Sequence, residues 1–251
     1  MTDQQHTALL EVRGATVRFG GHIAVREVDL EVHAGTITGL IGPNGAGKTT
    51  TFNVITGLQD TVSGRVLLSG VDLTGSKAHV RARRGIARTF QRLEVFGSLT
   101  ARENILTAAE IRRSWSKDRA GSNPHAETER LLDLVGIRAV ADERVDSMPT
   151  GLARLVELGR ALATRPKVLL LDEPASGLDE AESDAFAELL VELAAEGMGI
   201  LLVEHDVHLV MRVCSMIYVL DFGAILAQGT PEEIQQNQSV LDAYLGSAVE
   251  T

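Results

Sequence analysis

The N-terminal part of the chain alternates short apolar and polar stretches. Between Leu9 and Gly35 the alternation is interrupted by Gly14 and by the pair Gly20 and Gly21, which predicts antiparallel strands joined by turns. Short unbroken apolar runs later in the chain are typical of strands buried on both faces of a sheet. Such runs lie at 36–41, 168–171, 199–203 and 216–220, and further strands are expected at 64–68 and 85–90.

The spacing of apolar residues becomes helical in the middle of the chain. From Thr100 to about Ala163, apolar positions recur at helical intervals, which predicts a separate helical subdomain at about 92–163. Further helices are expected at 47–56 and 180–195. Because strands that alternate with helices indicate a parallel sheet, we expect one α/β domain over residues 9–249. It should contain a mixed sheet core, an antiparallel β subdomain and the inserted helical subdomain.

One polar stretch interrupts the helical region. Residues Arg112–Ala126 contain glycine and proline and are predicted to form a surface loop. Within this stretch, Trp115 is either a contact residue for a partner or a packing residue.

Composition limits the classes of function. The 251 residues are 44% hydrophobic and 23% charged, which excludes a collagen-like or disordered chain. The net charge of −10 has the wrong sign for general binding to nucleic acid or anionic lipid, and the aromatic content of 4% leaves few rings for stacking on single strands. We therefore expect no nucleic-acid partner.

Cysteine content and apolar segments bear on the compartment. The single cysteine, Cys214, cannot form an intrachain disulfide, which favours a reducing cytoplasm. The stretch MTDQQHT lacks the basic and apolar regions of a secretory signal, and no apolar run approaches the ~18 residues that cross a bilayer. A cytoplasmic protein is expected, and any contact with a membrane should depend on a partner.

The segment after the first apolar run carries the clearest chemistry. Residues 42–49 satisfy the pattern G-x-x-x-x-G-K-[ST] between a predicted strand and a predicted helix. The glycines let successive backbone N–H groups turn toward phosphate oxygens, Lys48 would reach the β and γ phosphates, and Thr49 would offer its hydroxyl to Mg²⁺. The residues expected to bind the nucleotide here are Gly42, Pro43, Asn44, Gly45, Ala46, Gly47, Lys48, Thr49 and Thr50.

Two adjacent acids end the apolar run at 168–171. Alone, Asp172 and Glu173 would be equally consistent with helix capping and with catalysis. Buried carboxylates at the end of a strand need cations or protons to stabilise them, and a phosphate site upstream supplies that need. We therefore expect Asp172 to hold Mg²⁺ and Glu173 to orient and deprotonate the water that attacks the phosphate.

Three further segments accompany these motifs. Pro-Ala-Ser-Gly-Leu-Asp follows the two acids at 174–179, Val-Glu-His-Asp contains His205, and Ala-Arg-Thr-Phe-Gln ends at Gln91. In order and spacing, the chain resembles the ATP-binding cassette (ABC) ATPases over nearly its whole length. The resemblance implies the P-loop NTPase fold of that family, ATP and Mg²⁺ as ligands, and contact of 174–179 with a second subunit.

The resemblance also implies roles for single residues. Gln91 would contact Mg²⁺ or the attacking water and sense a membrane partner, His205 would contact the γ-phosphate, and the ring of Phe19 would stack on adenine. The alternatives are a packed or capping histidine for His205 and simple core packing for Phe19. The expected catalytic residues are thus Glu173, His205 and Gln91, and the expected metal ligands are Thr49, Gln91 and Asp172.

One motif departs from the family pattern. Residues 148–152, Met-Pro-Thr-Gly-Leu, align with a signature normally close to Leu-Ser-Gly-Gly-Gln, so Pro149 and Leu152 replace the serine and the glutamine. The resemblance implies that Thr150 and Gly151 contact the nucleotide held by the opposite subunit. The alternative is a helix over 153–163 that Thr150 merely caps.

Within the family, the Ala-Arg-Thr-Phe-Gln segment, residues 201–234 and the final Asp-Ala-Tyr-Leu-Gly look like the LivG type of ATPase, from importers of branched-chain amino acids. This implies import of a small solute and peripheral attachment to the inner face of the cell membrane. The implied partners are transmembrane permease subunits and a second ATPase subunit, for which a chain different from this one is favoured over a second copy. An external solute-binding protein would act indirectly, through the permease. The alternatives are the ATPase of a lipid or lipopolysaccharide exporter, a soluble ABC ATPase acting on nucleic acid or ribosomes, and a regulatory subunit with little turnover.

The segment between Gln91 and the helical region has no clean periodicity. Some of its apolar residues, the cluster Leu93, Val95 and Phe96, are expected to line a groove for a short helix of a membrane subunit. Burial inside the helical subdomain is the alternative for each of them.

Overall fold

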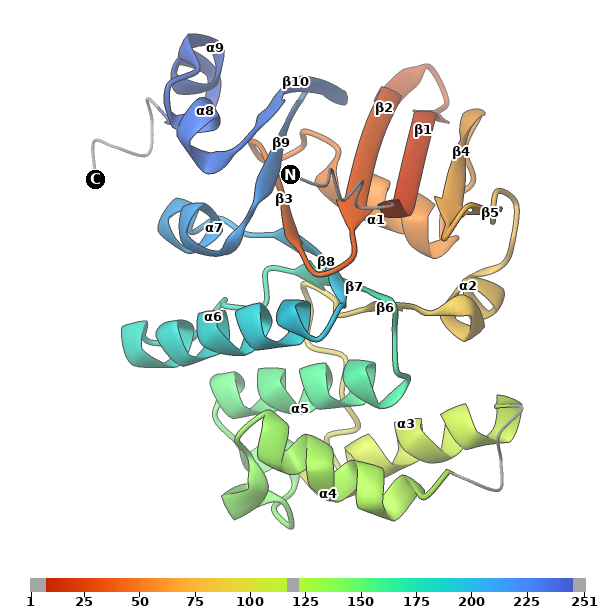
Figure 1. Ribbon diagram of the computed structural model, residues 1–251, viewed down its shortest axis with the longest axis vertical. Helices are drawn as coiled ribbons and strands as arrows, with labels where there is room; N and C mark the ends of the chain where they lie inside the picture. The colour runs from red at the N-terminus through yellow and green to blue at the C-terminus, as the bar shows by residue number, and fades with distance from the viewer. Residues whose placement is uncertain (1–7, 117–121, 246–251) are drawn as a thin grey trace, which may run out of the picture.

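The computed structural model describes residues 8–116 and 122–245, whose strands form two sheets (Figure 1). The strands are β1 (Ala8–Phe19), β2 (His22–His33), β3 (Ile37–Ile41), β4 (Ser63–Leu68), β5 (Val71–Asp72), β6 (Ile86–Arg88), β7 (Val168–Asp172), β8 (Gly199–Val203), β9 (Met216–Asp221) and β10 (Ala224–Gly229). The helices are α1 (Lys48–Thr56), α2 (Ala78–Arg84), α3 (Ala101–Trp115), α4 (Pro124–Leu134), α5 (Thr150–Ala163), α6 (Glu180–Ala195), α7 (Val207–Val213), α8 (Pro231–Gln235) and α9 (Gln238–Val240). Short turns of helix are η1 (Arg138–Val140), η2 (Val145–Ser147) and η3 (Leu241–Leu245).

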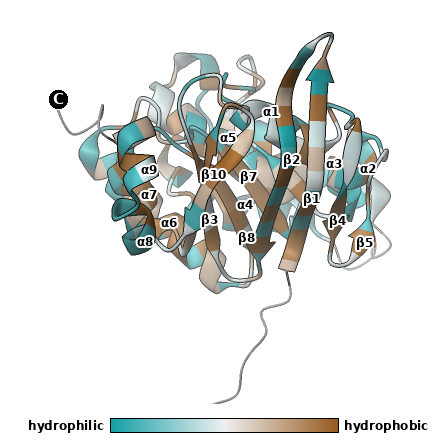
Figure 2. Ribbon diagram, turned by 90° about the horizontal axis from the view of Figure 1, so that it is seen from above, coloured by the Kyte–Doolittle hydropathy of each residue, from teal (hydrophilic) through white to brown (hydrophobic). Residues whose placement is uncertain are grey.

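The smaller sheet is antiparallel, as its alternating pattern predicts. Its order is β2-β1-β4-β5, and β1 and β2 are joined at Gly20 and Gly21. Along β1, Leu10, Val12 and Val17 are buried. Figure 2 shows the alternation along β1 and β2 as bands of brown and teal. One face of this sheet therefore packs on the core.

The larger sheet is mixed and places four loops at one edge. Its order is β10-β9-β3-β8-β7-β6, with β10 antiparallel to β9 and the other pairs parallel. Every residue of β3, β7 and β8 is buried. Because β3, β6, β7 and β8 run in one direction, the segments that follow them meet at the same edge. These segments contain the predicted phosphate loop, Gln91, Glu173 and His205.

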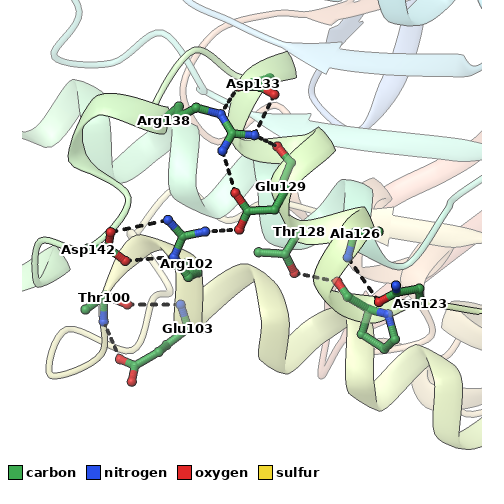
Figure 3. Close-up of polar contacts among 11 residues, drawn as sticks. Thr100, Arg102, Glu103, Asn123, Ala126, Thr128, Glu129, Asp133, Arg138 and Asp142 are labelled. Atoms are coloured by element: carbon green, nitrogen blue, oxygen red, sulfur yellow. Dashed lines mark hydrogen bonds and ion pairs between the residues drawn. The ribbon is translucent and has the colours of Figure 1, made fainter.

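Helices α3, α4 and α5 lie together, away from the antiparallel sheet, at the bottom of Figure 1. Apolar residues of all three helices belong to one core cluster with those of the large sheet. Arg102 of α3 pairs with Asp142 (2.8 Å) and Glu129, and Arg138 of η1 pairs with Glu129 and Asp133 (Figure 3). Exposed ion pairs add little stability each, so burial is the main force that holds these helices together.

Some boundaries in the helical region differ from the sequence prediction. The loop expected at 112–126 is shorter within the described residues, because α3 continues to Trp115 and α4 begins at Pro124; residues 117–121 lie outside them. Contacts from outside the segment stabilise this end of α3: the guanidinium of Arg83 lies 5.5 Å from the Trp115 ring, and Arg112 Nε donates to the carbonyl of Thr164 at 3.1 Å. Trp115 therefore has a packing contact within the chain, and its role as a contact residue for a partner stays a prediction.

Helix α5 begins three positions before the expected residue 153. Pro149 takes the N-cap position, and Thr150 is the first helical residue, without a capping hydrogen bond from its side chain. The alternative, in which Thr150 caps this helix, does not hold.

The C-terminal elements from β10 to η3 were not predicted from the apolar pattern. Only one residue is buried in each of β10, α8 and α9, so their periodicity is weak. Among the described residues, none of the helices has both the length and the apolar character needed to cross a bilayer.

Candidate active site

The loop between β3 and α1 has the backbone of a phosphate cradle. A Cβ atom at Gly42 would lie 2.0 Å from the carbonyl oxygen of Leu220, and one at Gly47 would lie 2.7 Å from that of Ala24. Both positions also have positive φ, of 149° and 108°. Glycine is therefore required there, because a side chain would both clash and be strained. The turn after β9 braces the loop, as the Gly223 N–H donates to the Ala46 carbonyl at 2.9 Å.

Lys48 begins α1 and closes the loop on itself. Its Nζ donates to the carbonyl oxygens of Gly42 (2.6 Å) and Pro43 (3.0 Å). Burial lowers the pKa of the ammonium below its ordinary value, and the nearby carboxylates of Glu173 and Asp172 oppose that shift. An anion placed in the loop would stabilise the charged form further.

Asp172 ends β7 and is held by an arginine. Its side chain is 2% exposed, and Arg88 Nη2 donates to its Oδ2 at 2.7 Å. The Asp172 N–H also donates to Thr89 Oγ1 at 3.3 Å. Pairing of this kind compensates the burial of a carboxylate, and removal of one partner is strongly destabilising.

Glu173 occupies a strained backbone position with both side-chain oxygens engaged. Its φ is 51°, unusual for a residue with a side chain, and its N–H donates to the Val203 carbonyl at 2.8 Å. Gln91 Nε2 donates to Oε2 at 3.0 Å, and His205 Nε2 lies 2.7 Å from Oε1. The structure therefore brings the three predicted catalytic residues into direct contact. Strain of this kind is often found at functional sites.

A cavity of about 280 Å³ opens between these groups. It joins the phosphate loop to Gln91 and Glu173, and the Thr49 side chain is exposed within it. Its lining residues are Ala24, Asn44, Gly45, Ala46, Gly47, Lys48, Thr49, Thr50, Gln91, Glu173 and Val203.

Five predicted nucleotide contacts lie outside this cavity lining. Two of them, Gly42 and Pro43, belong to the phosphate loop, and their carbonyl oxygens accept from Lys48. The other three are Phe19, Thr150 and Gly151. Phe19 is the last residue of β1, and its side chain is 51% exposed. Thr150 is exposed at the start of α5, whereas Gly151 is buried, where a Cβ would lie 2.9 Å from Leu178 Cδ2. The start of α5 thus packs against the 174–179 segment of the same chain. The roles of these three residues remain predictions.

Family profiles match two parts of the sequence. The profile described as ABC transporter matches residues 25–176, which include the phosphate loop, Gln91 and the two acids at the end of β7. The chain belongs to the ABC transporter family. A second profile, described as branched-chain amino acid ATP-binding cassette transporter, matches residues 224–250.

Relatives of this ABC ATPase extend the match over the chain. It is 40% identical to LivG of Escherichia coli and 39% identical to BraF of Pseudomonas aeruginosa, both named high-affinity branched-chain amino acid transport ATP-binding proteins, over 96% of this chain and 98% of each relative. It is 36% identical to LptB of Haemophilus influenzae, a lipopolysaccharide export system ATP-binding protein, over 88% of this chain and 90% of LptB.

A solved structure confirms the predicted fold class. The ADP conformation of MJ1267, an ATP-binding cassette of an ABC transporter, superposes with a TM-score of 0.82 at 29% identity and covers 95% of this chain and 99% of that one. The P-loop NTPase fold expected from the resemblance is therefore present.

The site has the groups that nucleotide hydrolysis requires. The phosphate loop lines the cavity and supplies the Lys48 ammonium, and Glu173 supplies a carboxylate beside the cavity. The donor set also suits magnesium, because Thr49, Asp172 and Gln91 offer neutral and anionic oxygens, which that ion prefers. The chain is thus an ATP-binding ATPase subunit.

Sequence analysis missed three residues that support this site. Asn53 and Arg88 meet beside Asp172, where Arg88 Nη1 donates to Asn53 Oδ1 at 2.6 Å. Glu204 is buried, and its Oε1 accepts from the Ala175 N–H (2.7 Å) while its Oε2 accepts from the His205 N–H (3.1 Å). Glu204 thus joins the loop after β7 to the loop after β8. Its position directly before His205 was the available signal.

We expect Glu204→Ala to lower the free energy of unfolding by about 1–3 kcal/mol, because the Ala175 and His205 N–H groups would lose their buried acceptor. Burial raises the pKa of the Glu204 carboxyl, and these two N–H groups counter the rise. Urea unfolding measures the effect. Glu204→Gln retains one acceptor oxygen and should lower the free energy of unfolding by less. An equal decrease in both variants would contradict the role of Glu204 as an acceptor for these two N–H groups.

The residues expected to line a groove, Leu93, Val95 and Phe96, are not among those that line the groove nearby. Leu93 and Val95 are partly buried against the main core cluster, which agrees with the alternative for these two residues. Phe96 is partly exposed, but the guanidinium of Arg160 lies 4.5 Å from its ring. A groove of about 350 Å³ lies nearby and has other walls. They are Thr56, Leu58, Ala78, Arg81, Ala82, Ile86, Ala87, Arg88, Phe90, Glu94, Ala108, Ile111, Glu157, Arg160, Ala161 and Thr164.

Proposed function

We propose that this chain binds and hydrolyses ATP to power the import of branched-chain amino acids. The observation that carries the proposal is 40% identity to LivG over 96% of the chain, together with the C-terminal match at 224–250 to the branched-chain amino acid profile. Identity to LptB is lower, at 36%, and makes lipopolysaccharide export the second candidate.

The geometry supports specific roles in hydrolysis. Thr49, Asp172 and Gln91 would hold Mg²⁺, which neutralises phosphate charge when bound. Lys48 binds the β and γ phosphates, and Glu173 accepts the proton of the attacking water. His205 orients the Glu173 carboxylate through their 2.7 Å contact and reaches toward the γ-phosphate.

A second ATPase subunit would complete the assembly. A cavity of about 610 Å³ lies beside the 174–179 segment and extends from Glu173 and His205 to Arg212. This position supports contact with a facing subunit, as the family resemblance implies. Permease subunits would hold the pair at the inner face of the cell membrane, with an external solute-binding protein acting through them.

The groove of about 350 Å³ is the proposed contact for a short permease helix. Leu58 and Ile111 line it and are each about half exposed, which leaves apolar surface for a partner. We expect Leu58→Glu and Ile111→Glu to weaken association with the permease by at least about tenfold, because a charge would be buried on docking. Co-purification from membranes measures this.

The matched control is Val191→Glu, which changes a similarly exposed apolar residue on α6 outside the groove. It should leave permease association unchanged. Equal association of all three variants would show that the permease contacts another surface.

The altered signature predicts unequal sites in a heterodimer. Pro149 has no hydroxyl to give to the γ-phosphate of the facing subunit, and such a hydrogen bond to a charged group is worth about 1.5–3 kcal/mol. With a partner whose signature is intact, Glu173→Gln in this chain should therefore stop most ATP turnover. The equivalent glutamate-to-glutamine change in the partner subunit should reduce turnover by less. ATPase assays of both single variants in the assembled complex test this; equal losses would contradict it.

The two candidate substrates are separated by one experiment. The complex that co-purifies with this chain should contain an amino-acid permease, and leucine with its binding protein should stimulate its ATPase activity. Co-purification with a lipopolysaccharide-exporting complex and no response to leucine would favour the second candidate.

A further inference from the structure

Arg88 ends β6, and its buried guanidinium makes an unusually complete set of contacts. The side chain is 5% exposed. Nε donates to the Thr89 carbonyl (3.2 Å), Nη1 to Asn53 Oδ1 (2.6 Å) and Nη2 to Asp172 Oδ2 (2.7 Å). The guanidinium carbon also lies 5.3 Å from the Phe52 ring centre and 4.8 Å from that of Phe90. Every nitrogen of the guanidinium is therefore engaged.

These contacts join three parts of the molecule. Phe52 and Asn53 belong to α1, the helix that follows the phosphate loop. Asp172 is the carboxylate expected to hold magnesium. Phe90 is 37% exposed and lines the groove of about 350 Å³.

Phe90, the member of this set that lines the groove, is hydrogen-bonded to the helical subdomain. The Phe90 N–H donates to Glu157 Oε1 at 3.3 Å, and its carbonyl accepts from Arg154 Nη1 at 2.8 Å. Both partners lie on α5. A displacement of α5, or contact of a partner with the exposed side of Phe90, would therefore act on a ring that packs against Arg88.

Arginine is suited to this position and lysine is not. Its guanidinium is planar, stays charged and donates in several fixed directions, so it can bind Asn53 and Asp172 at once while its faces contact two rings. Asp172 is 2% exposed, and its Oδ2 lies 2.7 Å from Arg88 Nη2, so the two buried side chains are packed together as an ion pair. Movement of the guanidinium must therefore be accompanied by movement of the carboxylate.

We propose that Arg88 is a positioning residue that relays contact at the groove, through Phe90, to the Asp172 carboxylate and α1. The inference rests on the proposed function, which supplies the permease as the occupant of the groove and magnesium as the ligand of Asp172. Arg88 acts through these residues and does not contact the reacting atoms.

A double-mutant cycle on the purified chain tests the relay. The dissociation constant for ATP in excess Mg²⁺ is measured for Phe90→Ala, Asp172→Asn and the double variant. Each variant changes the dissociation constant by some factor. The product of the factors for the two single variants should differ from the factor for the double variant by at least about threefold, because both residues contact Arg88. In an Arg88→Met background the same cycle should be multiplicative, with a discrepancy below about 1.5-fold.

The matched control is Ile111→Ala, which changes another apolar residue of the same groove, 49% exposed on α3. Its cycle with Asp172→Asn should be multiplicative. Phe90→Leu replaces Phe90→Ala if the alanine variant unfolds, because leucine keeps apolar volume and loses the ring face.

A multiplicative Phe90–Asp172 cycle in the wild-type background would overturn the relay, as would coupling that persists unchanged without Arg88. Failure of the proposed function gives a different result, because leucine with its binding protein would then leave the ATPase activity of the co-purified complex unchanged, and that measurement is separate from the cycle on the purified chain.

Discussion

Glu173→Gln is expected to reduce steady-state ATP hydrolysis by roughly 10²–10⁴-fold while ATP still binds. The amide cannot accept the proton of the attacking water, and the phosphate contacts of Lys48 and the loop are unchanged. The contacts of Glu173 with Gln91 (3.0 Å) and His205 (2.7 Å) show that its carboxylate is already oriented at the cavity. ATP should consequently trap a closed dimer of this variant.

Hydrolysis and equilibrium binding of ATP are measured on the same preparation. Glu196→Gln is the matched control, because it makes the same chemical change at an exposed residue that caps the end of α6. It should retain wild-type turnover. Undiminished single-turnover hydrolysis by Glu173→Gln would remove Glu173 from its catalytic role.

Lys48→Ala is expected to weaken ATP binding itself by roughly 10- to 150-fold. This range corresponds to the loss of about 1.5–3 kcal/mol, the contribution of a hydrogen bond to a charged group. The ammonium is buried at the phosphate loop, so water replaces its contact with the phosphates poorly. Equilibrium binding of ATP measures the change.

Lys77→Ala provides the control for Lys48→Ala, because Lys77 is exposed at the start of α2. It should bind ATP with wild-type affinity. Affinity within twofold of wild type for Lys48→Ala would show that the loop binds phosphate through its N–H groups alone, and the role given to Lys48 would be wrong.

The parts of the fold set by local pattern could be predicted from sequence. The large sheet follows from apolar runs that cannot be exposed, and the phosphate loop from glycines whose spacing is tied to backbone geometry. Once the strands run parallel, their following loops must meet at one edge. This is why Gln91, Glu173 and His205, far apart in sequence, come into contact.

The parts set by distant contacts could not be predicted in this way. Arg88 meets Asp172 across 84 positions, and Glu204 meets Ala175 across 29, with no periodicity to indicate either pair. The same limit explains Leu93 and Val95. An irregular apolar segment predicts that its side chains are covered, either by the same chain or by a partner. Which surface covers them is decided by the tertiary fold.

ATP-driven uptake by the reconstituted complex tests the central claim most directly. Proteoliposomes would contain this chain with its co-purified permease and partner ATPase, and leucine uptake would be followed with the solute-binding protein outside and ATP inside. We expect accumulation of leucine that requires Mg²⁺ and ATP and falls to background with Glu173→Gln in this chain. Leucine uptake that is equal with and without ATP, or unchanged by Glu173→Gln, would contradict the account.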